Sequence, residues 1–122
     1  MDVAYFFDTY ALIEVAKGSP SYRPYRGVQA ITTKLHLLEL YFAFCRERQR
    51  EQGKRLFGEL SGICIAIPDE VLLTAAEMRL AFLKQDLSYV DCIGYMLSRH
   101  LGIRFLTGDS KFRDKEQVAF VQ

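Results

Sequence analysis

Apolar and polar positions alternate in blocks along this chain, and the blocks predict strands separated by helices. Three short runs of bulky apolar residues, at 3–7, 63–68 and 103–106, are typical of strands buried on both faces of a sheet. The last five residues, VAFVQ, suit a further strand at the edge of that sheet.

Apolar residues at helical spacing occupy most of the sequence between these runs. We expect helices over residues 9–18, 32–52, 55–62, 69–85 and 88–102, with a loop or short helical turn over 19–28. The ends of these helices are marked by residues that favour helix termini, with Thr32 or Thr33, Asp69 and Ser88 as N-caps and Gly18, Gly53 and Gly102 as stops.

The order of these elements predicts the fold class. Strands alternate with helices, which favours a single α/β domain over residues 1–122, with a mostly parallel central sheet and helices on both faces. The 122 residues are enough for one hydrophobic core, and no linker, repeat or low-complexity segment divides them.

The amino-acid composition indicates where the protein is expected to act but says little about any reaction it catalyses. Half of the residues are apolar and the net charge is +1, so the overall charge does not indicate a nucleic-acid partner. The most basic segment, RERQREQGKR at 46–55, alternates bases with acids and is typical of a solvated helix end. Neither a secretory signal nor an apolar run of membrane-spanning length is visible, and Cys45, Cys64 and Cys92 lie among apolar neighbours. We therefore expect a cytoplasmic protein with reduced cysteines and no membrane association.

Two carboxylates follow predicted strands. Asp8 comes directly after the run at 3–7, and Asp109 comes shortly after the run at 103–106. The carboxyl ends of parallel strands meet at one edge of a sheet, where open α/β proteins bind ligands. Asp is also a common N-cap, so each residue could instead begin a helix. Two acids at the same edge favour a binding site, because Ser or Asn would cap a helix equally well.

Glu39 and Asp91 lie on predicted helices without a base nearby. Glu39 stands in KLHLLELYFAF, a stretch with almost no polar face, so we expect a largely buried helix on which Glu39 has no local partner. A salt bridge to a distant Arg is the structural alternative. Asp91 follows Ser88 at the spacing of a capping box, which is its structural alternative, and it also lacks a base four residues away.

Four acids brought together would repel one another unless a cation lay between them. Carboxylate oxygens are the ligands of Mg²⁺ and Mn²⁺, whereas the histidines and cysteines of this chain show no spacing typical of zinc ligands. We therefore expect Asp8, Glu39, Asp91 and Asp109 to hold Mg²⁺ or Mn²⁺. His36 lies one helical turn from Glu39 and could tune it, although we favour an ordinary core or surface histidine.

In this order the four acids resemble those of the PIN domain, a metal-dependent ribonuclease fold. The resemblance spans nearly the whole chain and rests on four segments, FFDTYALIEV, TTKLHLLELYF, LSYVDCIGYMLSRHLGI and RFLTGDSKF. The compact length is similar to that of the toxin subunits of VapBC toxin–antitoxin pairs.

This resemblance implies a PIN-like three-layer α/β/α fold and a metal-dependent endoribonuclease. The family's catalytic and metal-binding acids fall on Asp8, Glu39, Asp91 and Asp109, with Thr9 and Thr107 as hydroxyl neighbours. Hydrolysis of RNA with Mg²⁺ or Mn²⁺ would leave a 5′-phosphate and a 3′-hydroxyl. An antitoxin protein would be the partner, which makes this chain the toxin of a type II pair.

The sequence departs from the family's pattern in two places. The span between Asp8 and Glu39 is short for the family, so the contacts made by residues 20–29 would differ. Some members carry a further acid shortly after the last Asp, whereas residues 110–112 here read SKF. The second departure leaves open whether one or two metal ions bind.

Partners and rival functions follow from the same residues. We expect exposed aromatic residues at Tyr22, Tyr25 and Tyr89, which would form a homodimer or antitoxin surface. One rival is a non-catalytic PIN-like module that binds RNA or protein. A less favoured rival is a phosphoacceptor signalling domain, which would need an acidic pair after the first strand, where Asp8 stands alone.

Overall fold

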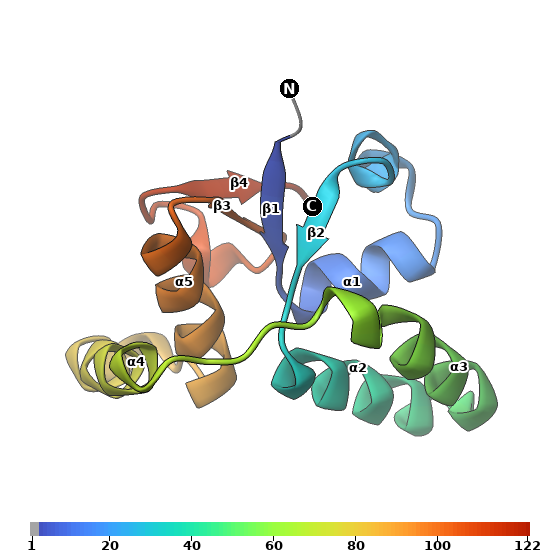
Figure 1. The fold of residues 1–122 in the computed structure, drawn as a ribbon, viewed down its shortest axis with the longest axis horizontal. Coiled ribbons are helices and arrows are strands. Elements are labelled where there is room, and N and C mark those ends of the chain that lie inside the picture. Colours follow the sequence, from blue (N-terminus) through green and yellow to red (C-terminus); the bar gives the residue numbers. More distant parts are fainter. Residues whose placement is uncertain (1–2) are drawn as a thin grey trace.

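Four parallel strands form the central sheet of the computed structural model, which describes residues 3–122 (Figure 1). The strand order is β2-β1-β3-β4, and every neighbouring pair is parallel. The strands are three or four residues long: β1 Ala4–Phe7, β2 Gln29–Ile31, β3 Arg104–Thr107 and β4 Val118–Phe120.

Five helices connect or follow these strands. They are α1 Thr9–Ala16, α2 Lys34–Arg46, α3 Arg50–Leu60, α4 Asp69–Ala81 and α5 Tyr89–Leu101. Four short 3-10 turns lie between them, η1 Pro20–Tyr25, η2 Ser61–Ile63, η3 Leu83–Gln85 and η4 Ser110–Phe112. None of the helices in residues 3–122 is long and apolar enough to cross a membrane.

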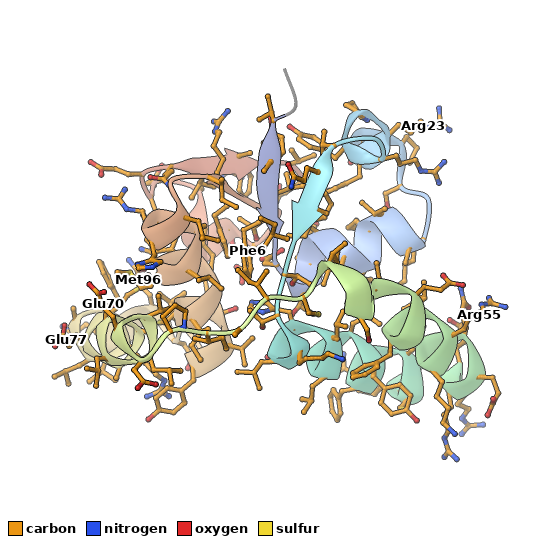
Figure 2. All side chains as sticks on the ribbon, viewed as in Figure 1. Phe6, Arg23, Arg55, Glu70, Glu77 and Met96 are labelled. Atoms are coloured by element: carbon orange, nitrogen blue, oxygen red, sulfur yellow. The ribbon has the colours of Figure 1, made fainter. Side chains whose placement is uncertain are left out.

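The two faces of the sheet are covered by different helices, which confirms the predicted α/β/α layering. Phe6 and Phe105 point to one face and pack with buried residues of α4 and α5. Phe7 and Leu106 point to the other face and pack with α1 and α2. Figure 2 shows Phe6 at the middle of the molecule, with Arg23, Arg55, Glu70 and Glu77 at its periphery.

The predicted strand at 63–68 is wrong. This segment is extended, but within residues 3–122 it joins the sheet region only through one isolated bridge between Cys64 and Thr32. The place beside β1 is taken by β2, which the sequence did not reveal because it is only three residues long. Ile65 and Ile67 still pack against the core, which explains the apolar pattern.

The predicted single helix over 32–52 is also wrong. Helix α2 ends at Arg46, Arg48 adopts a positive φ of 61°, and α3 starts at Arg50 and includes most of the short helix expected at 55–62. Gly53 lies inside α3, where a Cβ atom would stand 2.9 Å from the Cβ of Phe44 on α2. The glycine therefore permits close packing of two helices and does not end one.

Most of the predicted helix ends are confirmed. Thr33 and Ser88 cap α2 and α5 by accepting hydrogen bonds from backbone N–H groups, and Gly18 and Gly102 adopt positive φ values after α1 and α5. Besides Gly53, the prediction fails at Asp69, because Pro68 is the N-cap of α4 and Asp69 lies in the first turn. A carboxylate in that turn still interacts favourably with the helix dipole.

The three tyrosines predicted to be exposed differ in their exposure in the structure. Tyr22, expected to be exposed, is only 1% exposed, because it packs with Tyr10 and Tyr25 and its hydroxyl donates to the carbonyl of Val121. Tyr25 is half-buried, and Tyr89 is 60% exposed as expected. Of the three aromatics, Tyr89 is therefore the one that offers an exposed surface.

Candidate functional site

The carboxyl ends of β1 and β3 lie side by side, because these neighbouring strands are parallel and Phe7 pairs with Leu106. Asp8 follows β1 directly and Asp109 follows β3 after one further residue. Helix α5, which carries Asp91 in its first turn, contacts both strands, and α2, which carries Glu39, contacts α1 and α5. The topology thus brings all four elements toward one edge of the sheet (Figure 1).

Asp8 has both of the roles that the sequence left open. Its Oδ1 atom accepts a 2.8 Å hydrogen bond from the backbone N–H of Ala11, so it is the N-cap of α1. Its Oδ2 atom accepts a hydrogen bond from the hydroxyl of Thr107 at the end of β3. The side chain is only 5% exposed. Asp8 is therefore a buried carboxylate at the sheet edge as well as a helix cap.

Thr107 connects Asp8 to Asp109. Its Oγ1 atom, which donates to Asp8, also accepts a 3.0 Å hydrogen bond from the backbone N–H of Asp109. Asp109 Oδ1 in turn accepts from the backbone N–H of Lys111 at 3.0 Å and caps η4. One threonine hydroxyl thus fixes the relative position of two of the four predicted acids.

Glu39 is held by the residue that follows Asp8. The Thr9 hydroxyl donates to Glu39 Oε1 at 2.6 Å, across a separation of 30 residues. Glu39 is half-buried, and within residues 3–122 it forms no ion pair, so the alternative of a salt bridge to a distant Arg is wrong. The expectation of a helix buried nearly all round is also wrong, since Leu38 and Phe42 are 58% and 60% exposed.

Asp91 forms the capping box that the sequence suggested. The Ser88 side chain accepts from the backbone N–H of Asp91 at 3.0 Å, and Asp91 Oδ2 accepts from the backbone N–H of Ser88 at 2.9 Å. Asp91 is half-buried and, like Glu39, has no ion-pair partner in the described part of the chain. Its second carboxylate oxygen is not used by the cap.

The carboxylates act on one another electrostatically. Burial, together with the charges of Asp91 and Asp109, raises the pKa of Asp8 from 3.8 to about 7, against the hydrogen bonds from Thr107 and Ala11, which lower it. Burial also raises the pKa of Glu39 and that of Asp91. Asp91 adds to the rise for Glu39, and Asp109 adds to the rise for Asp91. Asp91 therefore lies within electrostatic reach of Asp8, Glu39 and Asp109.

The donor chemistry of these acids fits a hard divalent cation. All four supply carboxylate oxygens, and none of them forms an ion pair within residues 3–122. As the side chains lie, hydrogen bonds to Thr9, Thr107 and Ser88 hold them, and no group of three or more potential ligands among the described residues is close enough to enclose an ion. The oxygen donors thus fit Mg²⁺ or Mn²⁺ in kind, while their positions do not yet form a complete coordination shell.

His36 is a core residue, one of the two positions expected for it. Its contact with Gly94 of α5 was not visible in the sequence. It is 1% exposed, its Nδ1 atom lies 2.7 Å from Thr33 Oγ1, and its ring meets Phe6 edge-on at 5.0 Å between centroids. Gly94 of α5 makes room for it, because a Cβ atom there would lie 2.6 Å from His36 Nε2. Burial lowers the pKa of His36 to about 3, so the ring is neutral at physiological pH. His36 therefore joins the two helices that carry Glu39 and Asp91.

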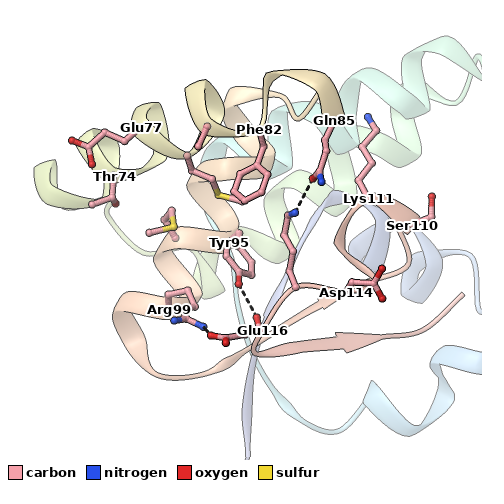
Figure 3. Close-up of a pocket in the computed structure, with 14 residues that line it drawn as sticks. Thr74, Glu77, Phe82, Gln85, Tyr95, Arg99, Ser110, Lys111, Asp114 and Glu116 are labelled. Atoms are coloured by element: carbon pink, nitrogen blue, oxygen red, sulfur yellow. Dashed lines mark hydrogen bonds and ion pairs between the residues drawn. The ribbon is translucent and has the colours of Figure 1, made fainter.

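A hollow of about 940 Å³ lies beside α4 and α5 (Figure 3). Its lining includes Ser110 and Lys111, the two residues after Asp109 in the sequence. The aromatic side chains of Phe82 and Tyr95 also line it. One signal for Lys111 was visible in the sequence, namely a base two positions after a predicted site acid. Its contact with the turn before α5 was not.

Comparisons with known proteins show the family and the fold of this chain. Residues 5–118 match the family model of the PIN domain. The toxin VapC20 of Mycobacterium tuberculosis, described as a sarcin-ricin loop cleaving toxin, has a TM-score of 0.79 and 16% identity, covering 97% of this chain and 99% of that one. VapBC2 of Rickettsia felis, bound to a promoter DNA fragment, has a TM-score of 0.73 and 14% identity over 98% and 100% of the two chains.

A toxin–antitoxin complex from Klebsiella pneumoniae is also similar, with a TM-score of 0.72 and 17% identity over 94% of this chain and 95% of that one. At these identities the likeness to solved structures establishes the fold alone. Among curated proteins, none matches the sequence significantly.

Proposed function

This chain belongs to the PIN domain family, and from that premise we propose that it is a divalent-metal-dependent endoribonuclease. We propose further that it is the toxin of a type II toxin–antitoxin pair and acts in the cytoplasm. The observation that carries the proposal is a set of four acids from distant parts of the chain. Asp91 acts electrostatically on or with the other three, Asp8, Glu39 and Asp109, and none of the four has a basic partner in an ion pair among residues 3–122.

The side chains have distinct tasks in this proposal. Asp8, Glu39, Asp91 and Asp109 would hold Mg²⁺ or Mn²⁺, which when bound supplies positive charge for a scissile phosphate and lowers the pKa of a water molecule. Asp8 carries a proton on part of the molecules near neutral pH, because its pKa is about 7, and this proton must leave before the carboxylate can act as a ligand.

Thr9 and Thr107 act as positioning residues. Each donates its hydroxyl hydrogen to an acid, Thr9 to Glu39 and Thr107 to Asp8, and so each fixes one carboxylate oxygen. A histidine base is not required by this mechanism. His36 is buried and neutral, and its role here is to hold α2 against α5.

An antitoxin partner is supported by two observations. Two of the similar structures are described as a toxin–antitoxin complex and as a VapBC protein bound to promoter DNA. In addition, Leu38 and Phe42 of α2 expose apolar side chains immediately next to Glu39 in the sequence and one turn further along the helix. Exposed apolar surface of this kind is typical of a protein interface. A partner that covered it would also cover the carboxylates.

A homodimer is part of the proposal. Exposed apolar side chains also occur on α4, at Leu72, Leu73 and Leu80, and on the first turn of α5, at Tyr89. These residues lie on the side of the sheet opposite α1 and α2. A second copy could pack there while the α2 surface stays available to an antitoxin.

The proposal is tested by RNA cleavage with and without divalent cation. We expect the purified protein to cleave RNA in Mg²⁺ or Mn²⁺ and to lose this activity in EDTA. Asp8→Asn and Asp91→Asn should retain the fold but lose cleavage, while Asp69→Asn, at an exposed position in the first turn of α4, should behave as the wild type. Undiminished cleavage in EDTA, or equal cleavage by all of these variants, would contradict the proposal.

A non-catalytic module that binds RNA or protein is the second candidate. It is favoured by the way internal hydrogen bonds hold the acids, with no three potential ligands in the described residues gathered around one point. This candidate predicts cation-independent binding without cleavage. The same assay therefore separates the two functions.

A further inference from the structure

One lysine follows closely after an acid of the proposed site and contacts the turn that leads to another. Lys111 is the second residue after Asp109, and its backbone N–H donates to Asp109 Oδ1 at 3.0 Å. Its ammonium Nζ reaches the other side of the edge, where it donates to the carbonyl of Asp86 at 3.0 Å. Asp86 comes two residues before Ser88, whose backbone N–H is bound by Asp91. Lys111 therefore connects the turn capped by Asp109 to the turn that precedes α5, the helix that carries Asp91.

The ammonium group is available to a ligand. Lys111 is exposed and forms no ion pair with any carboxylate in residues 3–122. Its single side-chain contact is to a neutral carbonyl, while an ammonium group has three donors. Its positive charge nevertheless lowers the pKa of Asp91, whereas the negative charge of Asp109 raises it.

Lys115, four residues further on, makes a useful contrast. Its Nζ donates to Gln85 Oε1 at 2.7 Å and lies 4.1 Å from the centre of the Phe82 ring, so its charge is already engaged (Figure 3). Both lysines line the same hollow. Lys111 is the one of the two whose backbone N–H is bound by a site acid, Asp109.

A phosphodiester that enters this edge brings a further negative charge next to four carboxylates. One divalent cation offsets only part of this negative charge, so a further positive group close to the phosphate would stabilise the bound substrate. Lysine binds phosphate as a mobile point charge, and its side chain can leave a carbonyl contact for a phosphate oxygen at little cost.

We propose that Lys111 binds a non-bridging oxygen of the scissile phosphate, so that one divalent cation and the Lys111 ammonium together supply the positive charge of the site. This inference rests on the proposed ribonuclease function and makes it more specific, because it assigns one metal ion where the sequence left one or two open. It also explains why the segment after Asp109 carries a base.

The test compares Lys111→Met with the matched variant Lys115→Met. Met keeps most of the side-chain volume and removes the charge. Binding of Mn²⁺ to the RNA-free protein, followed by electron paramagnetic resonance, should tighten by about threefold or more in Lys111→Met, because a positive charge beside the acids is lost. Binding of a labelled single-stranded RNA in EDTA should weaken, and its dependence on log salt concentration should become shallower by about 0.7.

Cleavage should change in the opposite direction to Mn²⁺ affinity. At saturating Mn²⁺, we expect kcat/KM for RNA to fall about tenfold or more in Lys111→Met. Lys111→Arg, which keeps the charge, should retain the salt dependence of the wild type, and Lys115→Met should match the wild type in Mn²⁺ affinity and cleavage. A merely structural role for Lys111 would not raise the affinity for Mn²⁺ while lowering cleavage.

Three results would overturn the inference. They are an unchanged Mn²⁺ affinity and salt dependence in Lys111→Met, an equal loss of cleavage in Lys115→Met, and a bound Mn²⁺ stoichiometry of two in the wild type. A wild-type protein that binds RNA but does not cleave it would instead contradict the proposed function itself. The failure of one is therefore distinguishable from the failure of the other.

Discussion

Replacing Asp8 by Asn should make the protein more stable in the absence of divalent cations. Asp8 is buried beside other acids, and its pKa in the folded protein is raised from 3.8 to about 7. At about 1.36 kcal/mol for each unit of pKa, keeping this carboxylate ionised costs the folded state about 4 kcal/mol above neutral pH. Asn carries no charge and avoids that cost.

Part of this gain is lost through weaker hydrogen bonds. The Asn amide oxygen can still accept from the N–H of Ala11, since Asn is as good an N-cap as Asp. Asn has one amide oxygen where Asp8 has two, so the contact of the Thr107 hydroxyl with a carboxylate oxygen is replaced by a contact with the amide NH₂, at a cost of about 1–2 kcal/mol. We therefore expect Asp8→Asn to raise the free energy of unfolding by about 2–3 kcal/mol at about pH 8.

The effect should depend on pH in a defined direction. Because the folded state binds the Asp8 proton more tightly than the unfolded chain, the wild type is most stable below the unfolded pKa and loses stability as the pH rises toward 7. Between about pH 5 and about pH 8 this loss amounts to about 3 kcal/mol in the wild type, and the Asp8 contribution is absent in Asp8→Asn. Glu39 and Asp91 shift stability in the same direction in both proteins.

The assay is urea denaturation in EDTA at both pH values, with Asp114→Asn as a control at an exposed site. A wild type that is as stable at the higher pH as at the lower would contradict the reasoning. So would an Asp8→Asn protein that is less stable than the wild type at the higher pH. Either result would mean that the ionised Asp8 carboxylate does not destabilise the folded protein.

Three further variants test other parts of the account. Glu39→Gln can still accept from Thr9, so it should fold normally but bind Mn²⁺ about tenfold or more weakly by calorimetry, and unchanged affinity would exclude Glu39 as a ligand. Thr107→Val removes the hydrogen bond that lowers the pKa of Asp8, so the acidic limb of the pH–rate profile should move to higher pH, and an unmoved limb would refute this. Gly94→Ala places a methyl group 2.6 Å from His36 Nε2, so the free energy of unfolding, measured by thermal unfolding, should fall by about 1–3 kcal/mol. An unchanged stability would show that α2 and α5 are not tightly packed there.

The sequence predicted those elements that carry strong local signals. The strand before Asp8, the helix capped by Ser88 and the strand before Thr107 have apolar runs and capping residues within a few positions, and the structure has them where expected. The parallel sheet follows from their alternation with helices.

The errors arose where long-range packing decided the outcome. Gly53 looked like a helix stop, yet it lies inside α3 because Phe44 of α2 occupies the space that a side chain would need. The apolar run at 63–68 looked like a strand, but the position beside β1 was taken by β2, which is too short to be recognised from its pattern.

The acids themselves were found because a carboxylate at a strand end, or on a helix without a base nearby, is unusual. Their connections were not visible in the sequence. The hydroxyl of Thr107 joins Asp8 to Asp109, and that of Thr9 joins the start of α1 to Glu39 across 30 residues. Such contacts depend on how the chain folds back, which no local pattern encodes.

The central claim is that Asp8, Glu39, Asp91 and Asp109 jointly bind the divalent cation that RNA cleavage requires. The most direct measurement is a crystal of the protein soaked in Mn²⁺, with the ion located by its anomalous scattering. The account predicts one peak at the carboxyl ends of β1 and β3, coordinated by oxygens of these four acids. A peak elsewhere, or none at this edge in a crystal of protein that cleaves RNA, would contradict it.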